Sequence, residues 1–344
     1  MKKVGILTFQ NANNYGAVFQ AYALQEAVKS LGADVKVINY DSPPMGLKNV
    51  QESRFDDFTR NYLCLTEGSD DIKDIDISVF DIFITGSDQV WNPELTRNDN
   101  TYFLNFADDN IIKAAYAASI ALDKDGLNRN RACFEQFVPK FDAISLREET
   151  HIDFIKEIVG DKKEVTSLID PSIILTGEEY VQKLDLKDVE DENYIFLFSY
   201  SLDPKLVDFA NLVSLHTGYK IVAVSAYKDY FLTKGSIALK DATPIQWMEY
   251  IKKARLVLTD SFHGLMYSIV FERPFYAYTP ARPNVVRIMD ALKMLGFEDR
   301  RISRVNNIGD VSLELDYTYA RKVLEAERKK SYDYLEKVLN MKKG

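Results

Sequence analysis

Short apolar runs alternate with amphipathic stretches along nearly the whole chain. The runs near residues 4–9, 80–85 and 256–259 are rich in β-branched and aromatic residues, which is typical of buried strands. By the same criterion, strands are predicted at 4–9, 35–39, 80–85, 114–120, 143–146, 165–172, 194–200, 220–224, 256–259 and 275–278.

Between these runs, apolar residues recur every three or four positions, which predicts amphipathic helices. Helices are expected at 17–30, 128–140, 148–159, 204–216, 244–253, 262–271, 285–295 and 317–343. Residues 43–75 are mixed and polar, and short helices are expected there. The charged stretch 182–194 is the best candidate for a linker between domains.

Alternating strands and helices favour parallel sheets that carry helices on both faces. We predict an α/β protein of two Rossmann-like domains facing a cleft, formed by residues 1–185 and 186–315. The final segment, 316–344, is predicted to be a long amphipathic helix that packs back on the first domain.

Composition narrows the class of protein. Of the 344 residues, 46% are hydrophobic and 28% are charged, which is typical of a globular protein with a sizeable core. The net charge of −9 argues against a nucleic-acid surface and against strong binding to anionic membranes. No apolar stretch approaches the ~18 residues of a membrane span, and the N-terminal apolar run is too short for a signal peptide.

The two cysteines, Cys64 and Cys133, fit neither a zinc motif nor a disulfide framework. Both are expected to be thiols in a reducing compartment, so the expected location is the cytoplasm. Peripheral association with a membrane is left open, and the sequence does not indicate an oligomeric state.

The segment LTDSFHG, residues 258–264, joins a predicted strand to a predicted helix. Ligands bind at the carboxyl ends of parallel strands, and a helix N-terminus attracts anions. Asp260 or Ser261 can cap the helix, Gly264 would let another group approach its first turn, and His263 would face a ligand there. The alternative is a histidine that only binds a nearby carbonyl.

Two further strand ends carry polar residues, and each has a structural alternative. The segment ITGSDQVWN, residues 84–92, places Asp88 and Trp91 after one strand, although Gly-Ser-Asp is also a common turn and a tryptophan is more often part of the core. Arg147 follows another strand, at the start of a helix. Because a cation there opposes the helix dipole, an anion is expected nearby.

The remaining histidines and the first loop give weaker indications. His151 is expected at the surface, and His216 at a helix end. The loop TFQNANNYG, residues 8–16, holds one glycine, so it is neither a dinucleotide-binding fingerprint nor a P-loop. Its asparagines can bind polar groups.

Together, NNYGAVFQAYAL, ITGSDQVWN, SLREE and LTDSFHGLMYSIVFERPF resemble the polysaccharide pyruvyl transferase family over roughly residues 1–300. The resemblance implies a two-domain fold like that of GT-B glycosyltransferases. It also implies transfer of the enolpyruvyl group of phosphoenolpyruvate to a sugar of a surface polysaccharide or its lipid- or nucleotide-linked precursor. The product would be a pyruvate ketal, with release of phosphate.

The same resemblance suggests a role for each motif. Phosphoenolpyruvate would be a co-substrate, with neither cofactor nor metal required. The first domain would hold the acceptor and the second the donor. The residues implied in catalysis are His263, Asp88 and Arg147. Those implied in donor binding are Ser261, Phe262, Gly264, Arg287 and Arg282, and those implied in acceptor binding are Asn13, Asn14, Tyr15, Gly86, Ser87, Gln89, Trp91 and Asn92.

One position departs from the pattern of some family members. They carry an arginine where this chain has Ser261. Arg282 or Arg287 is expected to replace the missing cation. The departure keeps two alternatives open: a GT-B glycosyltransferase that uses a nucleotide sugar, and a non-catalytic glycan-binding protein.

Overall fold

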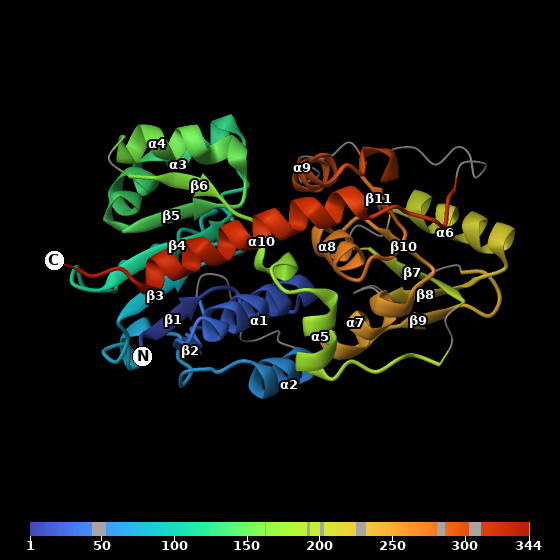
Figure 1. Cartoon of the computed structure of the whole chain (residues 1–344), viewed down its shortest axis with the longest axis horizontal. Coiled ribbons are helices and arrows are strands. Elements are labelled where there is room, and N and C mark those ends of the chain that lie inside the picture. Colours follow the sequence, from blue (N-terminus) through green and yellow to red (C-terminus); the bar gives the residue numbers. More distant parts are fainter. Residues whose placement is uncertain are drawn as a thin grey trace. The chain divides into compact units, whose positions relative to one another are not determined.

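Two parallel sheets, each accompanied by helices, make up the protein (Figure 1). The computed structural model describes residues 1–42, 53–161, 163–190, 193–199, 203–224, 232–280, 286–302 and 311–343. The chain forms two compact units: Met1–Ile174 together with Glu327–Gly344, and Leu175–Ala326. The predicted α/β class with two Rossmann-like halves is confirmed.

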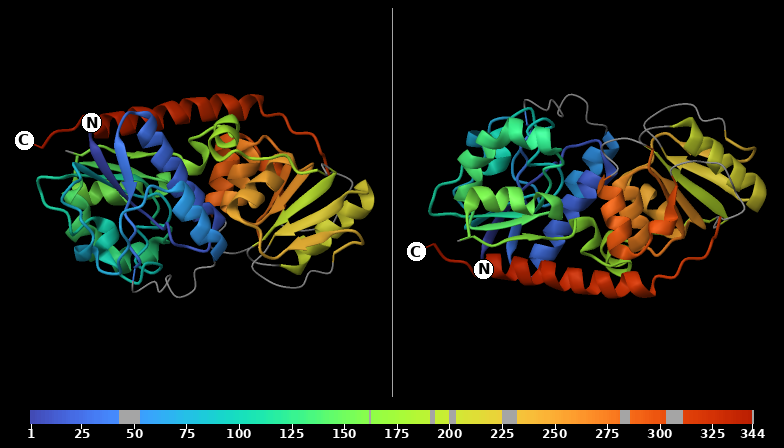
Figure 2. Two further views of the ribbon diagram at one scale, coloured as in Figure 1. Left: turned by 90° about the horizontal axis from the view of Figure 1, so that it is seen from below. Right: turned by 90° about the horizontal axis from the view of Figure 1, so that it is seen from above.

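The first sheet has six parallel strands in the order β2-β1-β3-β4-β5-β6. They are β1 (Lys3–Leu7), β2 (Asp34–Val37), β3 (Ile82–Thr85), β4 (Ile112–Ala118), β5 (Ala143–Leu146) and β6 (Val165–Ser167). The residues of β3, β4 and β5 are all buried, because helices cover both faces of the sheet (Figure 2). Since β1 pairs with both β2 and β3, the topological switch point, where ligands bind in such sheets, lies there.

The helices of the first unit are α1 (Tyr15–Ser30), α2 (Ser53–Tyr62), α3 (Lys124–Phe137), α4 (Ile152–Val159) and the last part of α10 (Thr318–Leu339). Helix α1 begins after Asn14, whose side chain accepts the amide protons of Gly16 and Ala17. As predicted, the C-terminal helix packs back on this unit. The Tyr334 hydroxyl donates to the carbonyl of Ala115 at 2.7 Å.

The second sheet also has six parallel strands, in the order β12-β11-β10-β7-β8-β9. They are β7 (Tyr194–Phe198), β8 (Lys220–Val224), β9 (Ile237–Leu239), β10 (Leu256–Thr259), β11 (Phe275–Tyr278) and β12 (Arg301–Ile302). This is the strand order of Rossmann dinucleotide-binding folds, and its switch point lies between β7 and β10. The second unit also contains α5 (Gly177–Leu184), α6 (Pro204–Thr217), α7 (Pro244–Lys253), α8 (Phe262–Val270), α9 (Val286–Leu295) and the first part of α10.

The sequence did not predict α5, β9 or β12. The expected linker at 182–194 begins inside α5, and it buries Leu184 and Leu186 despite its charge. The division between the units lies earlier, between Ile174 and Leu175, so α5 belongs to the second unit rather than to the predicted first domain. Strands β9 and β12 have three and two residues, too few to show a hydrophobic period.

Candidate active site

In the second unit, polar residues gather where β10 ends and α8 begins. Ser261 caps α8: its hydroxyl accepts the amide proton of Gly264 at 3.3 Å. Its own amide donates to the Thr259 hydroxyl at 3.0 Å. These bonds fix the turn at the switch point and direct the amides of the first helical turn toward the ligand-binding edge of the sheet.

His263 lies in the first turn of α8, and the residue is 6% exposed. Its ring packs edge-on against Phe262, with the ring centroids 5.2 Å apart. The guanidinium of Arg287, on α9, lies 5.6 Å from the centroid of the Phe262 ring. The structure therefore brings Ser261, Phe262, His263 and Arg287 together, whereas Arg282 lies outside the described residues.

Gly264 has a different role from the one expected. A Cβ at this position would lie 2.4 Å from Oγ1 of Thr259 and 3.0 Å from the Phe198 ring. Glycine is therefore required because α8 packs closely on β10 and β7. The groups that approach Gly264 belong to the protein, which explains the glycine without a ligand.

Asp260 adds a carboxylate to the same turn. The Ser199 hydroxyl, at the end of β7, donates to Asp260 Oδ2 at 2.9 Å. This bond joins the two strands that flank the switch point. Asp260 was noted from the sequence as a possible helix cap, but Ser261 takes that role.

In the first unit, the loop after β3 is held by close packing. Gly86 has φ +112°, and a Cβ there would lie 2.3 Å from the carbonyl oxygen of Tyr116. Ser87 is fully buried; its hydroxyl donates to the carbonyl of Ala117 at 2.7 Å, and its amide donates to Gln20 at 3.1 Å. Both residues shape the loop, which corrects the expectation that they contact an acceptor.

Asp88 follows directly and is the central residue of this edge. Its Oδ1 accepts the amide proton of Gln89 at 2.9 Å and lies 3.7 Å from Nη1 of Arg147. Its backbone has φ +61°, a left-handed conformation that is strained for a residue with a Cβ. The surrounding loop therefore fixes the backbone from which the Asp88 carboxylate projects.

Arg147 is enclosed by three carboxylates. Nη1 donates to Asp170 Oδ2 at 2.7 Å and lies near Asp88, and Nε is 3.4 Å from Glu148 Oε1. Although burial opposes the charge, these carboxylates raise the pKa of Arg147. The expected anion beside Arg147 is thus supplied by the protein, and the geometry is not that of a residue held open for a substrate anion.

Glu148 and His151 extend this network. Burial opposes ionisation of Glu148, but hydrogen bonds from His151 and Ser119 and the charge of Arg147 lower its pKa to about 2. His151 is buried rather than at the surface, with Nε2 at 2.9 Å from the Leu122 carbonyl and Nδ1 at 3.5 Å from Glu148. The sequence missed the roles of Glu148 and Asp170, although both follow strands of this sheet, β5 and β6.

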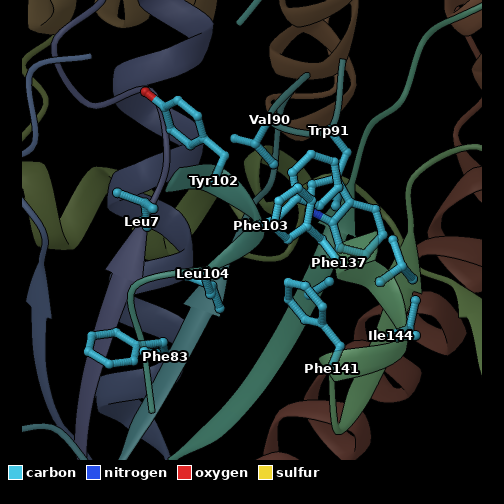
Figure 3. Close-up of a cluster of buried hydrophobic side chains, with 14 of the residues drawn as sticks. Leu7, Phe83, Val90, Trp91, Tyr102, Phe103, Leu104, Phe137, Phe141 and Ile144 are labelled. Atoms are coloured by element: carbon cyan, nitrogen blue, oxygen red, sulfur yellow. The ribbon is translucent and has the colours of Figure 1, made fainter. Parts of the chain in front are cut away.

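Trp91 belongs to the core. It is fully buried, stacks on Phe103 with the ring centroids 5.5 Å apart, and meets Phe141 edge-on at 5.1 Å (Figure 3). Such a ring cannot stack on a sugar without opening the core, so the expected platform is wrong. Asn92 caps the following turn through the amides of Glu94 and Leu95.

The expected acceptor residues near the start of α1 also differ in exposure. Asn14 caps the helix, and Tyr15 is buried against Phe55 with the ring centroids 5.1 Å apart. Asn13 is exposed and Gln89 is half-buried. Of the expected acceptor residues, Asn13 is thus the most exposed, while Gln89 and the capping residue Asn14 keep part of their surface. Within the described ranges, no group of three or more His, Cys, Asp or Glu side chains could hold a metal ion.

Comparison with known proteins identifies the family. The family model described as polysaccharide pyruvyl transferase matches residues 14–281, which include both strand edges described above. A search of curated protein sequences finds no match to the chain.

In the part of the chain that is described, no helix is long and apolar enough to cross a membrane.

Solved structures show a similar fold at low sequence identity. UDP-GlcNAc 2-epimerase from Methanocaldococcus jannaschii is 12% identical, with a TM-score of 0.56, and the match covers 94% of this chain and 92% of that one. A putative UDP-N-acetylglucosamine 2-epimerase from Listeria monocytogenes is 10% identical, with a TM-score of 0.55, and covers 100% and 93%. These matches support the GT-B-like fold, and at this identity they say nothing about the reaction.

Proposed function

The chain belongs to the polysaccharide pyruvyl transferase family, and we propose that it moves the enolpyruvyl group of phosphoenolpyruvate onto a sugar of a surface polysaccharide or its precursor. The observation that carries the proposal is the group formed by His263, Phe262 and Arg287 at the start of α8, beside the switch point of the second sheet. A helix N-terminus with an arginine and a histidine suits a ligand that has both a phosphate and a carboxylate.

The proposed reaction balances without a cofactor. A proton is added to the methylene carbon of phosphoenolpyruvate, which becomes a methyl group, and positive charge develops at C2. Two hydroxyls of the acceptor sugar form C–O bonds to C2, and the bond from C2 to the phosphate oxygen breaks. The hydroxyls release two protons, so one supplies the methyl group and the other leaves with phosphate.

Residues of the second unit would bind and protonate the donor. Ser261 and the N-terminus of α8 suit the phosphate, and Arg287 suits a carboxylate or phosphate oxygen. His263 suits delivery of the proton or a hydrogen bond to the phosphate. The proposal keeps Ser261, Phe262, His263 and Arg287 as donor residues.

Residues of the first unit would act on the acceptor. Asp88 is the carboxylate of this edge with the most exposed side chain, 11% against 6% for Glu148 and 1% for Asp170. We therefore assign it the role of base toward an acceptor hydroxyl. Asn13 and Gln89 are the proposed hydrogen-bonding partners of the sugar.

A glycosyltransferase that uses a nucleotide sugar is the second candidate. It is favoured by the carboxylate of Asp260 beside the helix N-terminus, where some family members have an adjacent arginine at the position of Ser261. A carboxylate accepts hydroxyl protons, so it suits the hydroxyls of a ribose or hexose. The two candidates differ in the donor that binds and in whether phosphate is released.

Turnover separates these reactions directly. The protein is incubated with phosphoenolpyruvate and a panel of neutral and amino sugars in free and lipid-linked form, and phosphate release and a ketal product are measured. We expect acceptor-dependent phosphate release that falls by at least about a hundredfold in His263→Gln, because general acid catalysis contributes roughly that much. His216→Gln, an exposed histidine on α6, is the matched control. Full activity in His263→Gln would exclude its proposed role.

A further inference from the structure

We propose that Arg147 is a positioning residue: with Asp170 it forms a buried clamp that holds the Asp88 carboxylate in place, and it does not bind the donor. This inference rests on the proposed function, because Asp88 is the proposed base. It changes the role of the arginine from substrate ligand to internal support and brings Asp170 into the reaction as a second positioning residue.

The distances define the clamp. One nitrogen, Nη1 of Arg147, lies 2.7 Å from Asp170 and 3.7 Å from Asp88, so the guanidinium stands between the two carboxylates. Asp170 is fixed in turn, because its Oδ1 accepts the amide proton of Ser172 at 3.0 Å. The clamp is therefore anchored to the backbone at its inner end.

The three side chains of the clamp differ in how deeply they are buried. The exposed fraction of the side chain rises from 1% at Asp170 through 5% at Arg147 to 11% at Asp88. The innermost carboxylate makes the shortest contact, and the outermost makes the longest. A substrate that reaches this edge meets Asp88 first, while the arginine lies behind it.

The charges of the network support the same reading. Asp88, Glu148 and Asp170, the three charged groups that hold Arg147 within 4 Å, are carboxylates, and Glu148 is itself paired with His151. His151 Nε2 faces the Leu122 carbonyl, which only accepts, so that nitrogen carries a proton. Three carboxylates around one guanidinium leave the network negative whether or not His151 is charged, which suits a base and disfavours a site for the trianionic donor.

The amide of Gln89 reports on the clamp without any reaction. It donates to Asp88 Oδ1, so its hydrogen exchange depends on where that carboxylate points. In Arg147→Met and in Asp170→Asn we expect the Gln89 amide to exchange at least about tenfold faster than in the native protein. Arg129→Met, which removes an exposed pair with Glu94 in the same unit, is the control and leaves the exchange unchanged.

Two further measurements separate positioning from donor binding. Calorimetry with phosphoenolpyruvate is expected to give dissociation constants for Arg147→Met and Asp170→Asn within about twofold of the native value. In turnover, kcat falls by at least about a hundredfold with little change in KM for phosphoenolpyruvate, and Arg147→Met adds little to the loss already caused by Asp88→Asn.

Two outcomes would overturn the clamp. The Gln89 amide could exchange at the native rate in Asp170→Asn and Arg147→Lys, the variants chosen in case Arg147→Met does not fold. That result would mean that Asp88 is oriented without the clamp. Binding of phosphoenolpyruvate weakened by about tenfold or more in these variants makes Arg147 a donor ligand. If the native protein neither binds nor turns over phosphoenolpyruvate, the proposed function fails, while the exchange of Gln89 still decides whether the clamp exists.

Discussion

At the scale of single residues, Arg147 shows what a local sequence pattern can predict. A cation at the start of a helix opposes the helix dipole, and that misfit predicted an anion nearby. The anions are the protein's own: Asp88, Glu148 and Asp170. Because Asp170 reaches Arg147 through the pairing of β5 with β6, neither segment alone reveals the contact.

Trp91 is a second residue that the sequence left undecided. Its position after a strand suits a sugar platform as well as a core ring, and residue type does not distinguish them. Trp91 is a core residue because Phe103 and Phe141, which come from separate segments, enclose its ring (Figure 3). His263 does lie in the first turn of a helix, as the strand-to-helix junction predicted.

At this scale, His151 makes the stability of the first unit depend on pH. Burial opposes its charged form, but the hydrogen bonds to Glu148 and to the Leu122 carbonyl raise the pKa of His151 above its usual 6.5. The stabilisation is therefore fully present below pH 6.5 and is lost as pH rises through the pKa of the folded protein. We expect His151→Gln to lower the free energy of unfolding more at about pH 5.5 than at about pH 8.5, as measured by urea denaturation.

The Glu148→Gln background is the control for this pH effect. Without the carboxylate, the imidazolium loses its partner, and His151→Gln should then cost a similar amount at both pH values. An equal cost at both pH values in the native background would contradict the ion pair.

At the scale of elements, most helices and strands could be predicted from the hydrophobic pattern. Strand β5 has the predicted limits, and α6, α7 and α8 differ from theirs by a residue or less at each end. Helix α5 was missed although Thr176 and Glu179 form a capping box there, a signal that the sequence contains. The charged residues that follow favoured a linker and not a helix.

Helix α8 gives a direct test at this scale, because its close approach to β10 requires Gly264. In Gly264→Ala, the added methyl group meets the Thr259 hydroxyl and the helix must shift. We expect a loss of about 1–3 kcal/mol in the free energy of unfolding, the usual range for overpacking. Differential scanning calorimetry would show a lower Tm for the variant.

Relief by a second substitution identifies the contact. Thr259→Ala removes the atom nearest to the new methyl group, so the double variant should lose less stability than the sum of the two single variants. Additive losses would show that the strain lies elsewhere in α8.

At the scale of the whole molecule, alternation of strands and helices predicted two parallel sheets, but not the order of their strands. That order depends on pairings such as β7 with β10, whose residues are far apart in the sequence. The two compact units divide between Ile174 and Leu175, whereas charge marked residues 182–194 as the candidate linker. The C-terminal helix was predicted from its amphipathic pattern, and its last part belongs to the first unit.

This arrangement predicts that the first unit depends on the end of the chain. Removing residues 327–344 deletes the Tyr334 hydrogen bond to Ala115 and uncovers the ring of Tyr116 on β4. We expect faster hydrogen exchange in β4, while β7 and β10 in the second unit keep their protection. Unchanged protection of β4 in the shortened chain would show that the helix contributes little to the unit.

The measurement that tests the central claim most directly is a calorimetric titration with phosphoenolpyruvate, with UDP-sugars in parallel. We expect saturable binding of phosphoenolpyruvate to the native protein. The dissociation constant should rise at least about tenfold in His263→Gln and Arg287→Met, since losing a charged hydrogen bond costs about 1.5–3 kcal/mol. Binding of a UDP-sugar without phosphoenolpyruvate binding, also with acceptor sugars present, would contradict it and favour a glycosyltransferase.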